Sequence, residues 1–230
     1  MRIAIVTAMW QRPDVFRIFA INTVKLIAET DRHCFNVFCV GSEGERSKAL
    51  AEEYGFNYIE HENQPLWKKW NAVTAQARTW SPDYVLMMGS DDIMDAVLLK
   101  RYNNAIRQRI DFIGCLDWYF YHMPTRKAIH WHGYNDRETR GKTVGAGRML
   151  SRNLLNKLDW QPWQQPMGGE GMDGTMMRRL KGIQYTRTGI RMGSGCGLDI
   201  KTGTNITPFN LWPNSKYTAA EHLLKRFEGI

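Results

Sequence analysis

The chain has 230 residues, of which 43% are hydrophobic and 23% charged, an ordinary globular composition that excludes a largely disordered chain. This length suits one α/β domain and leaves enough apolar material for a sizeable core. The 31 Lys and Arg residues against 23 Asp and Glu give a net charge of +8, which favours polyanionic partners: nucleic acid, an anionic membrane face or phosphorylated small molecules.

The amino-terminal residues 1–14 contain only a short apolar run followed by a polar turn. That run has the wrong length and layout for a signal peptide, and no later stretch reaches the roughly 18 apolar residues of a membrane span. The four cysteines form no CxxC pair, which is typical of reduced thiols. We therefore expect a cytoplasmic protein without a transmembrane segment.

Strands and helices alternate in the first half of the chain. Apolar, β-branched runs predict strands at residues 2–7, 35–40, 55–60, 83–88 and 112–114, and helical spacing predicts helices at 13–28, 44–54, 66–80 and 98–109. This alternation predicts βαβ units, and therefore an α/β fold with a Rossmann-like, mostly parallel sheet flanked by helices. Ligands of such sheets bind at the carboxyl ends of the strands, which here are followed by loops at residues 7–14 and 89–95.

The second half has a different pattern. Residues 115–147 are rich in aromatic residues, His and Gly, and predict a hairpin region rather than another βαβ unit. Helices are predicted near residues 152–158, 174–181 and 218–227, with a strand-like run at 183–188. No repeat or low-complexity linker separates these elements, so we expect residues 1–230 to form a single domain.

Two adjacent carboxylates, Asp91 and Asp92, follow the apolar strand at 83–88. They would repel each other at the rim of a parallel sheet unless a countercharge were present. Mg²⁺ or Mn²⁺ would supply it, because hard divalent ions prefer carboxylate oxygens, and such an ion can stabilise a diphosphate leaving group. The alternative is a turn or helix cap, where Ser and Asp are also favoured. The motif alone does not decide between the two.

Four segments, taken in order, resemble glycosyltransferases of the GT-A fold, especially the family-2-like group. They are IAIVTAMWQRPD at 3–14, PLWKKWNAV at 65–73, DYVLMMGSDD at 83–92 and GEGMDGTMMRRLKG at 169–182, and together they cover most of residues 1–190. The resemblance implies transfer of a hexose from a UDP-sugar to an acceptor hydroxyl with Mn²⁺ or Mg²⁺, with inversion. It also implies a nucleotide-sugar-binding half at 1–114 and an acceptor-binding half at 115–230.

The same resemblance assigns residues to the donor. Thr7 and Ala8 would line the nucleotide base, and Arg12 would lie close to the uracil or the phosphates. Lys68 and Asn71 would reach the nucleotide or the donor sugar.

Ser90, Asp91 and Asp92 match the DxD motif of the family, with Ser where an Asp is usual. Asp92 would be the direct metal ligand, and Asp91 would contact the sugar or ribose or add a second ligand. Further along, Asp199 and Lys201 alternate in a strand-like run, so both could face the cleft, as a metal ligand and a diphosphate clamp. The alternative for that run is a surface hairpin with alternating charges.

Inverting transfer needs a base that deprotonates the acceptor hydroxyl. Asp173 matches the family's base position, with Glu170 as the reserve candidate. Asp173 could instead cap the helix that follows it, and the two roles are compatible.

The acceptor is expected to be polyanionic. Aromatic residues gather in the second half of the chain, with Arg and Lys among them between residues 126 and 148. Such a surface suits DNA carrying a hydroxymethylated base, or a phosphorylated glycan or lipid precursor of the cell surface. His130 and His132 have a spacing that can hold zinc on a strand, although no second paired motif accompanies them.

Two other classes of protein remain as alternatives. A non-catalytic basic module could bind nucleic acid, and a metal-dependent phosphohydrolase or nuclease could use the same Asp pair. The chain has neither a P-loop nor a GxGxxG motif, which argues against kinases and dehydrogenases.

Overall fold

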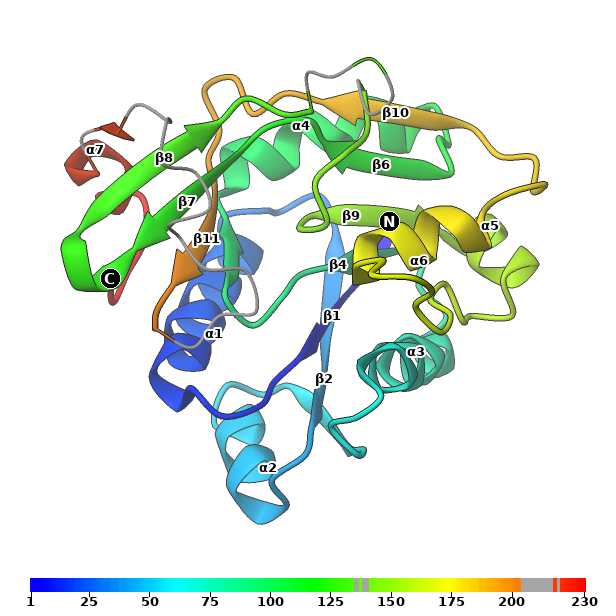
Figure 1. The fold of residues 1–230 in the computed structure, drawn as a ribbon, viewed down its shortest axis with the longest axis horizontal. Helices are drawn as coiled ribbons and strands as arrows, with labels where there is room; N and C mark the ends of the chain where they lie inside the picture. The colour runs from blue at the N-terminus through cyan, green and yellow to red at the C-terminus, as the bar shows by residue number, and fades with distance from the viewer. Residues whose placement is uncertain (135–136, 138–140, 204–216, 219) are drawn as a thin grey trace.

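The computed structural model describes residues 1–134, 137, 141–203, 217–218 and 220–230 (Figure 1). The strands are β1 (Arg2–Ala8), β2 (Cys34–Gly41), β3 (Asn57–Glu60), β4 (Tyr84–Met87), β5 (Asp92–Met94), β6 (Phe112–Cys115), β7 (Trp118–His122), β8 (Lys127–Trp131), β9 (Arg148–Ser151), β10 (Arg187–Ile190), β11 (Gly197–Lys201) and β12 (Tyr217–Thr218). The helices are α1 (Pro13–Ala28), α2 (Glu45–Glu52), α3 (Leu66–Ala77), α4 (Ala96–Arg107), α5 (Arg152–Lys157), α6 (Met172–Arg179) and α7 (Glu221–Leu224), with short 3₁₀ turns at Arg78–Trp80 and Met123–Thr125.

A seven-stranded sheet in the order β10-β6-β9-β4-β1-β2-β3 forms the centre of the molecule. The neighbours β4, β1, β2 and β3 are parallel, as are β6 and β10, whereas β9 runs antiparallel to both β4 and β6. This arrangement confirms the predicted α/β fold with a mostly parallel sheet flanked by helices.

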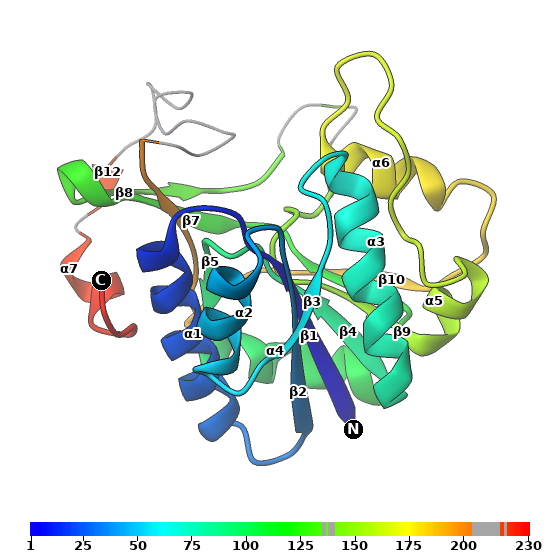
Figure 2. The ribbon, with the colours of Figure 1, turned by 90° about the horizontal axis from the view of Figure 1, so that it is seen from below.

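Side-chain alternation along β1 divides the core into two layers. Ile3 and Ile5 pack on one face against α1, α2 and α4, while Ala4 and Val6 pack on the other against α3, α5 and α6. Figure 2 shows the two groups of helices on opposite sides of the sheet. Because both faces are covered, the central strands are apolar throughout rather than alternating, which is the pattern that made them recognisable in the sequence.

A second sheet of five strands, in the order β12-β8-β7-β11-β5, lies beside the first (Figure 1). Strands β7 and β8 form the hairpin predicted for residues 115–147. Strand β11 is parallel to β7 and antiparallel to β5, and this second pairing joins the loop after β4 to a segment near the end of the chain. Each sheet therefore contains strands from both halves of the chain.

Several boundaries differ from those predicted. The strand expected at 183–188 is β10 at Arg187–Ile190, and the helix expected at 174–181 begins earlier, at Met172. Strands β5 and β9 were not predicted, since each is very short and is held in place by neighbours distant in sequence. All four cysteines are unpaired, and no helix in the described ranges has the length and apolar character needed to cross a bilayer.

Candidate functional site

Three carboxylates meet at the carboxyl edge of the parallel strands. Asp91 and Asp92 follow β4, and Asp199 on β11 pairs directly with Asp92 on β5 in the antiparallel ladder. One oxygen from each of the three lies within 4.8 Å of the others. We call these residues the acidic cluster. Among the described residues, it is the only group of three or more His, Cys or acidic side chains placed closely enough to hold a metal ion.

Two cations accompany the three carboxylates. Arg12 Nη1 lies 3.0 Å from Asp91 Oδ2, and Lys201 Nζ lies 2.6 Å from Asp199 Oδ2. Asp92 has no ion pair of this kind within the described chain, and its Oδ2 instead accepts a hydrogen bond of 2.9 Å from the backbone N–H of Gly89. Counted over the described residues, the acidic cluster therefore has one more carboxylate than it has paired cations.

Burial makes the excess charge costly. Asp92 is 9% exposed, and its pKa is raised well above the usual range by desolvation first and by the charges of Asp199 and Asp91 second. Desolvation and the charge of Asp91 likewise raise the pKa of Asp199 to about 7. Asp199 Oδ1 is buried and has no hydrogen-bond partner among the residues that the structure describes. An unpartnered carboxylate oxygen beside two further carboxylates is the environment that a divalent cation compensates.

The loop before Asp92 is tightly packed around its carboxylate. A Cβ atom at Gly89 would lie 2.6 Å from Asp92 Oδ2 and 2.8 Å from Asp91 Oδ1, so only glycine allows this close approach of backbone and carboxylates. Ser90 is buried, at 8% exposed. The Ser in the acidic motif therefore belongs to the packed turn, and Asp199 from β11 supplies the third carboxylate of the group.

The loop after β1 reaches the acidic cluster from the neighbouring strand. Arg12, expected near the uracil or the phosphates, has a left-handed backbone at the start of α1 and pairs with Asp91. Thr7 is fully buried and its hydroxyl has no hydrogen-bond partner in the described part of the chain, while Ala8 is half-buried at the end of β1. Their placement beside the carboxyl end of β4 follows from the parallel β1–β4 pairing.

Two adjacent lysines of α3, Lys68 and Lys69, have different environments. Lys68 is exposed and lies over the ring of Trp67, with its Nζ 5.5 Å from the ring centroid. Lys69 is 1% exposed and donates to Met9 O at 2.6 Å, to Ser42 Oγ at 2.6 Å and to Asn63 Oδ1 at 3.1 Å.

Those three acceptors belong to the loops that follow β1, β2 and β3, so Lys69 ties together the carboxyl-terminal loops of the parallel strands. Burial lowers the pKa of Lys69 to about 8. The burial of Lys69 could have been inferred from the helical periodicity of the sequence, because Lys69 lies on the same helix face as the buried Val73 and Ala77, four and eight residues later.

Asn71 has a structural role in this arrangement. Its Nδ2 donates to Trp163 O at 2.9 Å, and its Oδ1 accepts from Trp163 N at 3.0 Å. Asn71 is 6% exposed, and both polar atoms of its side chain are engaged by one backbone residue. Asn71, expected to reach the nucleotide, thus anchors the loop between α5 and α6 onto α3 in this structure.

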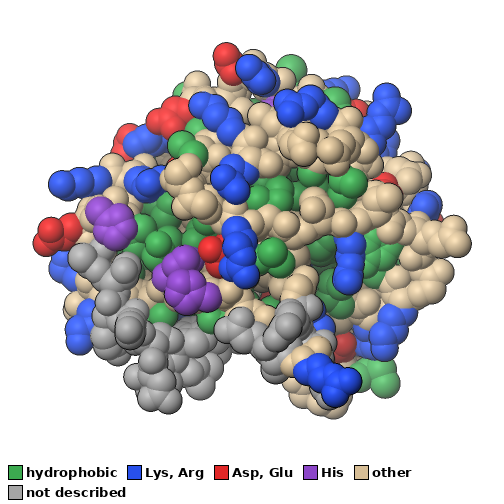
Figure 3. All heavy atoms as spheres, turned by 90° about the horizontal axis from the view of Figure 1, so that it is seen from above, with side chains coloured by type: hydrophobic (Ala, Val, Ile, Leu, Met, Phe, Trp, Pro, Cys, Tyr) green, Lys and Arg blue, Asp and Glu red, His purple; other side chains and the backbone are tan. Residues whose placement is uncertain are grey.

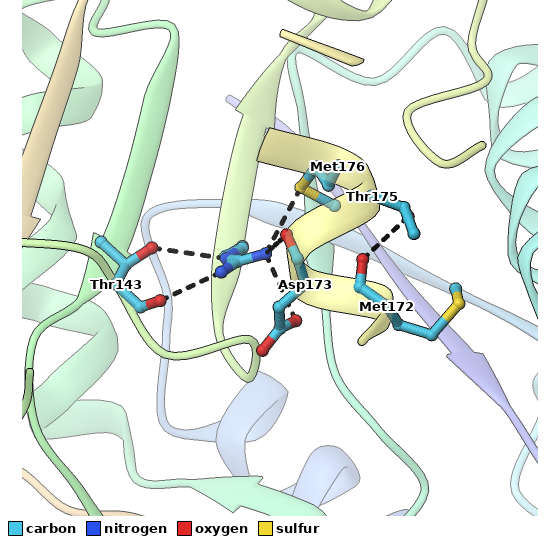
Figure 4. Close-up of polar contacts among 6 residues, drawn as sticks. Thr143, Met172, Asp173, Thr175 and Met176 are labelled. Atoms are coloured by element: carbon cyan, nitrogen blue, oxygen red, sulfur yellow. Dashed lines mark hydrogen bonds and ion pairs between the residues drawn. The ribbon is translucent and has the colours of Figure 1, made fainter. Parts of the chain in front are cut away.

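Asp173 lies in the first turn of α6 and is held by a buried arginine. Arg148, on β9 and 3% exposed, donates from Nη1 to Asp173 Oδ1 at 3.3 Å and to Asp173 O at 3.4 Å. The same guanidinium donates to Thr143 O at 3.0 Å and Thr143 Oγ1 at 3.3 Å, and Figure 4 shows Thr143 and Asp173 on opposite sides of it. The Asp173 side chain remains 50% exposed, and any side chain at Gly145 would collide with its carboxylate.

The helix-cap alternative for Asp173 does not hold. The cap residue of α6 is Gly171, and no side chain caps the helix. A carboxylate in the first turn still interacts favourably with the helix dipole. Asp173 is therefore oriented by Arg148, half-exposed, and free of a capping function.

The Glu170 carboxylate, the reserve candidate for the base, forms an ion pair with Arg178. Its carboxylate accepts from Arg178 Nη2 at 2.8 Å and from Arg178 Nε at 3.1 Å, and these bonds lower its pKa. A carboxylate held in this two-pronged contact is a weaker proton acceptor, because its charged form is stabilised. Between the two candidate bases, the geometry favours Asp173.

His130 on β8 and His132 just after it make contacts with neighbouring side chains. His130 Nε2 lies 3.0 Å from Asp117 Oδ2, its ring stacks on Tyr119 at a centroid distance of 4.4 Å, and the ring of His132 lies 4.2 Å away. Within the described ranges, the two histidines are not part of a group of three or more metal-binding side chains. Residues 135–136 and 138–140 of the basic, aromatic region lie outside the described residues.

No protein-family model and no curated protein matches the chain. Solved structures do match its fold. The 1–349 fragment of S. aureus TarS in complex with UDP-GlcNAc has a TM-score of 0.59 at 14% identity, over 89% of this chain and 60% of that one. A mannosyltransferase from Pyrobaculum calidifontis, in complex with GDP-Man and Mn2+, has a TM-score of 0.56 at 10% identity, over 91% of this chain and 59% of that one.

The chain thus spans about three fifths of the length of the solved structures that it matches. At such low identity, the similarity supports only the fold. The chemistry has to be argued from the residues of the site. The order of strands and helices, with its mostly parallel sheet flanked on both faces, is that of the GT-A glycosyltransferase fold.

Proposed function

We propose that the chain is a metal-dependent glycosyltransferase that moves a hexose from a UDP-sugar to an acceptor hydroxyl with inversion. The observation that carries this proposal is the acidic cluster at the carboxyl edge of a GT-A-like sheet. The similar structures support it, since the TarS fragment binds UDP-GlcNAc and the mannosyltransferase is in complex with GDP-Man and Mn2+.

The residues of the acidic cluster fit Mn²⁺ or Mg²⁺. Asp92 and Asp199 would hold the ion, because within the described residues Asp92 has no ion-pair partner and Asp199 has a buried oxygen without a hydrogen bond. Asp91 would add a ligand or contact the ribose. Such an ion supplies a charge that stabilises the diphosphate leaving group. Carboxylate oxygens are its preferred ligands.

The basic side chains around the acidic cluster would act on the diphosphate. Arg12 and Lys201 now pair with Asp91 and Asp199, and both are mostly or wholly withdrawn from solvent. When a metal ion neutralises the carboxylates, Arg12 and Lys201 can donate some of their hydrogen bonds to phosphate oxygens instead. Thr7, Ala8 and Lys68 remain candidates for contacts to the nucleotide.

Asp173 would remove the proton from the acceptor hydroxyl. It is half-exposed on the side of the molecule where α6 and the loop before it extend, and Arg148 fixes its orientation. A general base must be within hydrogen-bond reach of the proton that it accepts. Arg148 holds Asp173 through its backbone and side chain together, so we assign Arg148 the role of a positioning residue.

The acceptor is proposed to be polyanionic, either DNA with a hydroxymethylated base or a phosphorylated glycan or lipid precursor. The net charge of +8 supports this class of acceptor.

The test is a thermal-shift panel of nucleotide-sugars with and without Mn²⁺, followed by transfer assays on the donor that stabilises the protein. Stabilisation by one UDP-sugar only in the presence of metal is the expected result. Asp173→Asn should then keep that shift and lose transfer by about 10²–10⁴-fold, which is the usual contribution of a general base. Glu170→Gln is the matched control and should keep most of the transfer activity. A donor shift that needs no metal, or normal transfer by Asp173→Asn, would overturn the assignment.

A further inference from the structure

A groove of about 860 Å³ lies apart from the acidic cluster. Its walls come from the exposed side of α4, from the end of β10 with Arg191, and from the turn between α1 and β2 that carries Arg32. None of its lining residues belongs to the acidic cluster or contacts Asp173. The groove is therefore separate from the residues proposed to bind the donor and to act as the base.

The groove is strongly basic. It is lined by five cationic side chains and by a single acidic one, Asp31, so its net charge is +4, half of the +8 of the whole chain. The five cationic residues are Arg32, Lys100, Arg101, Arg107 and Arg191. All five are exposed. Figure 3 looks down on the side of the molecule that carries α4 and β10, and shows Lys and Arg side chains spread across it.

Within the part of the chain that the structure describes, these cations have no carboxylate as an ion-pair partner. None of the ion pairs within the described residues involves any of the five. Arg101 and Arg191 are instead anchored to backbone carbonyls: Arg101 Nε donates to Arg191 O at 2.9 Å, and Arg191 Nη1 donates to His132 O at 3.2 Å. Two guanidinium groups are thus held in place beside other positive charges, an arrangement that an anionic ligand would stabilise.

Helical geometry arranges part of the basic lining in a row. Lys100, Asn103, Asn104 and Arg107 occupy positions i, i+3, i+4 and i+7 of α4, so they share one face of the helix. The opposite face is the buried stripe that contains Leu98, Leu99, Tyr102, Ala105 and Ile106. The row presents cations at both ends with amide groups between them, which suits an extended ligand that carries repeated negative charges.

The lining also limits which polyanion fits. It contains no aromatic side chain, so it offers no platform on which unpaired bases could stack. The volume lies in the range of small-ligand sites and is concave, which suits a slender chain better than a duplex or a flat membrane. Guanidinium and ammonium groups with neighbouring amides recognise phosphate oxygens.

We propose that this groove binds the phosphodiester backbone of a single flexible polyanionic chain, without reading bases. A single-stranded nucleic acid and a phosphate-linked glycan both present that chemistry. The binding is separate from the donor site and needs neither metal nor nucleotide-sugar.

The experiment measures binding of a fluorescent abasic oligodeoxynucleotide by anisotropy, between about 50 and 200 mM salt. The groove variant is Lys100→Ala/Arg107→Ala, because among the described residues neither side chain makes a hydrogen bond or an ion pair that holds the fold. Losing two phosphate contacts should reduce the slope of log affinity against log salt by about 1.4, equivalent to roughly 25-fold weaker binding at 0.1 M salt. The matched control, Arg46→Ala/Lys48→Ala on the exposed face of α2, removes the same charge elsewhere and should bind as the wild type does.

Three further arms decide the ligand class. An oligonucleotide of the same length with bases should bind like the abasic one, linear polyphosphate should compete with both, and duplex DNA should bind more weakly. The proposal would be overturned if the groove variant and the α2 control lost equal affinity for the abasic oligonucleotide. It would also be overturned if duplex DNA or the base-bearing strand bound markedly more tightly than the abasic oligonucleotide. The groove variant is shown to be folded if UDP and Mn²⁺ raise its Tm as much as they raise that of the wild type. If the wild type itself shows no such rise, the proposed donor site is refuted, whereas the result for the groove is unaffected.

Discussion

In the absence of metal, the acidic cluster holds three carboxylates in repulsive contact, and Asp92→Asn is the substitution that relieves this repulsion with the least disturbance. One oxygen from each of the three carboxylates lies within 4.8 Å of the others. Asp91 and Asp199 each have a cationic partner, whereas Asp92 contacts Gly89 N–H. The asparagine carbonyl oxygen can still accept that hydrogen bond. Above the raised pKa of Asp92, where its carboxyl group is ionised, the main change is therefore the loss of one negative charge, and stability is compared at such a pH.

The magnitude follows from the separation. Two unit charges at that distance repel by about 3.5 kcal/mol at the effective dielectric constant of about 20 that suits protein sites. Arg12 and Lys201 offset part of this repulsion, which leaves about 2 kcal/mol of expected stabilisation. For a chain of this size, that corresponds to a rise in Tm of about 4–8 °C in the presence of chelator.

The assay is thermal unfolding of wild type and variant, first in chelator and then with Mn²⁺ and UDP. Wild type should gain about 2.7 kcal/mol when the ligands are at a hundredfold excess over Kd, and Asp92→Asn should lose most of this gain. The control is Asp14→Asn on the exposed face of α1, which should change stability by no more than about 0.5 kcal/mol. The reasoning is refuted if Asp92→Asn is less stable than wild type in chelator and responds normally to Mn²⁺.

Two predictions concern the scaffold around the site. Asn71→Ala should lower the free energy of unfolding in urea by about 2–3 kcal/mol, because it leaves the buried N–H and C=O of Trp163 unpaired; a loss below about 0.5 kcal/mol would contradict the anchoring role. Burial raises the pKa of Asp111, but hydrogen bonds from Ser151 and Thr186 among others outweigh this and lower it below its usual value. The stabilisation by Asp111 should therefore be present above about pH 4 and disappear as pH falls through the lower folded-state pKa. Asp111→Asn should flatten the acid branch of a stability-against-pH curve, and parallel curves would argue against it.

Much of the fold could be read from the sequence because the central strands are buried on both faces. The apolar runs of β1, β2 and β4 and the helical spacing between them are local patterns, and together they indicate a parallel sheet. That sheet in turn places the loops after β1 and β4 at one edge, which is why Arg12 and Asp91 were expected near the same ligand and do meet.

The pairing of Asp199 with Asp92 depended on tertiary structure. It arises from the antiparallel contact of β11 with β5, two short strands whose sequences contain no signal for that partner or register. The same limit applies to Asn71 and Lys69, since the backbone groups that they bind come from distant loops.

The sequence by itself determined most of the helices and the strands of the central parallel sheet, because periodicity and burial are encoded within each segment. The tertiary structure decided the short strands β5 and β9 and the contacts through which side chains share a site. It joined Asp199 to the acidic pair, gave Asp173 its buried arginine and engaged Glu170 with Arg178, because such contacts join segments that local sequence patterns treat separately.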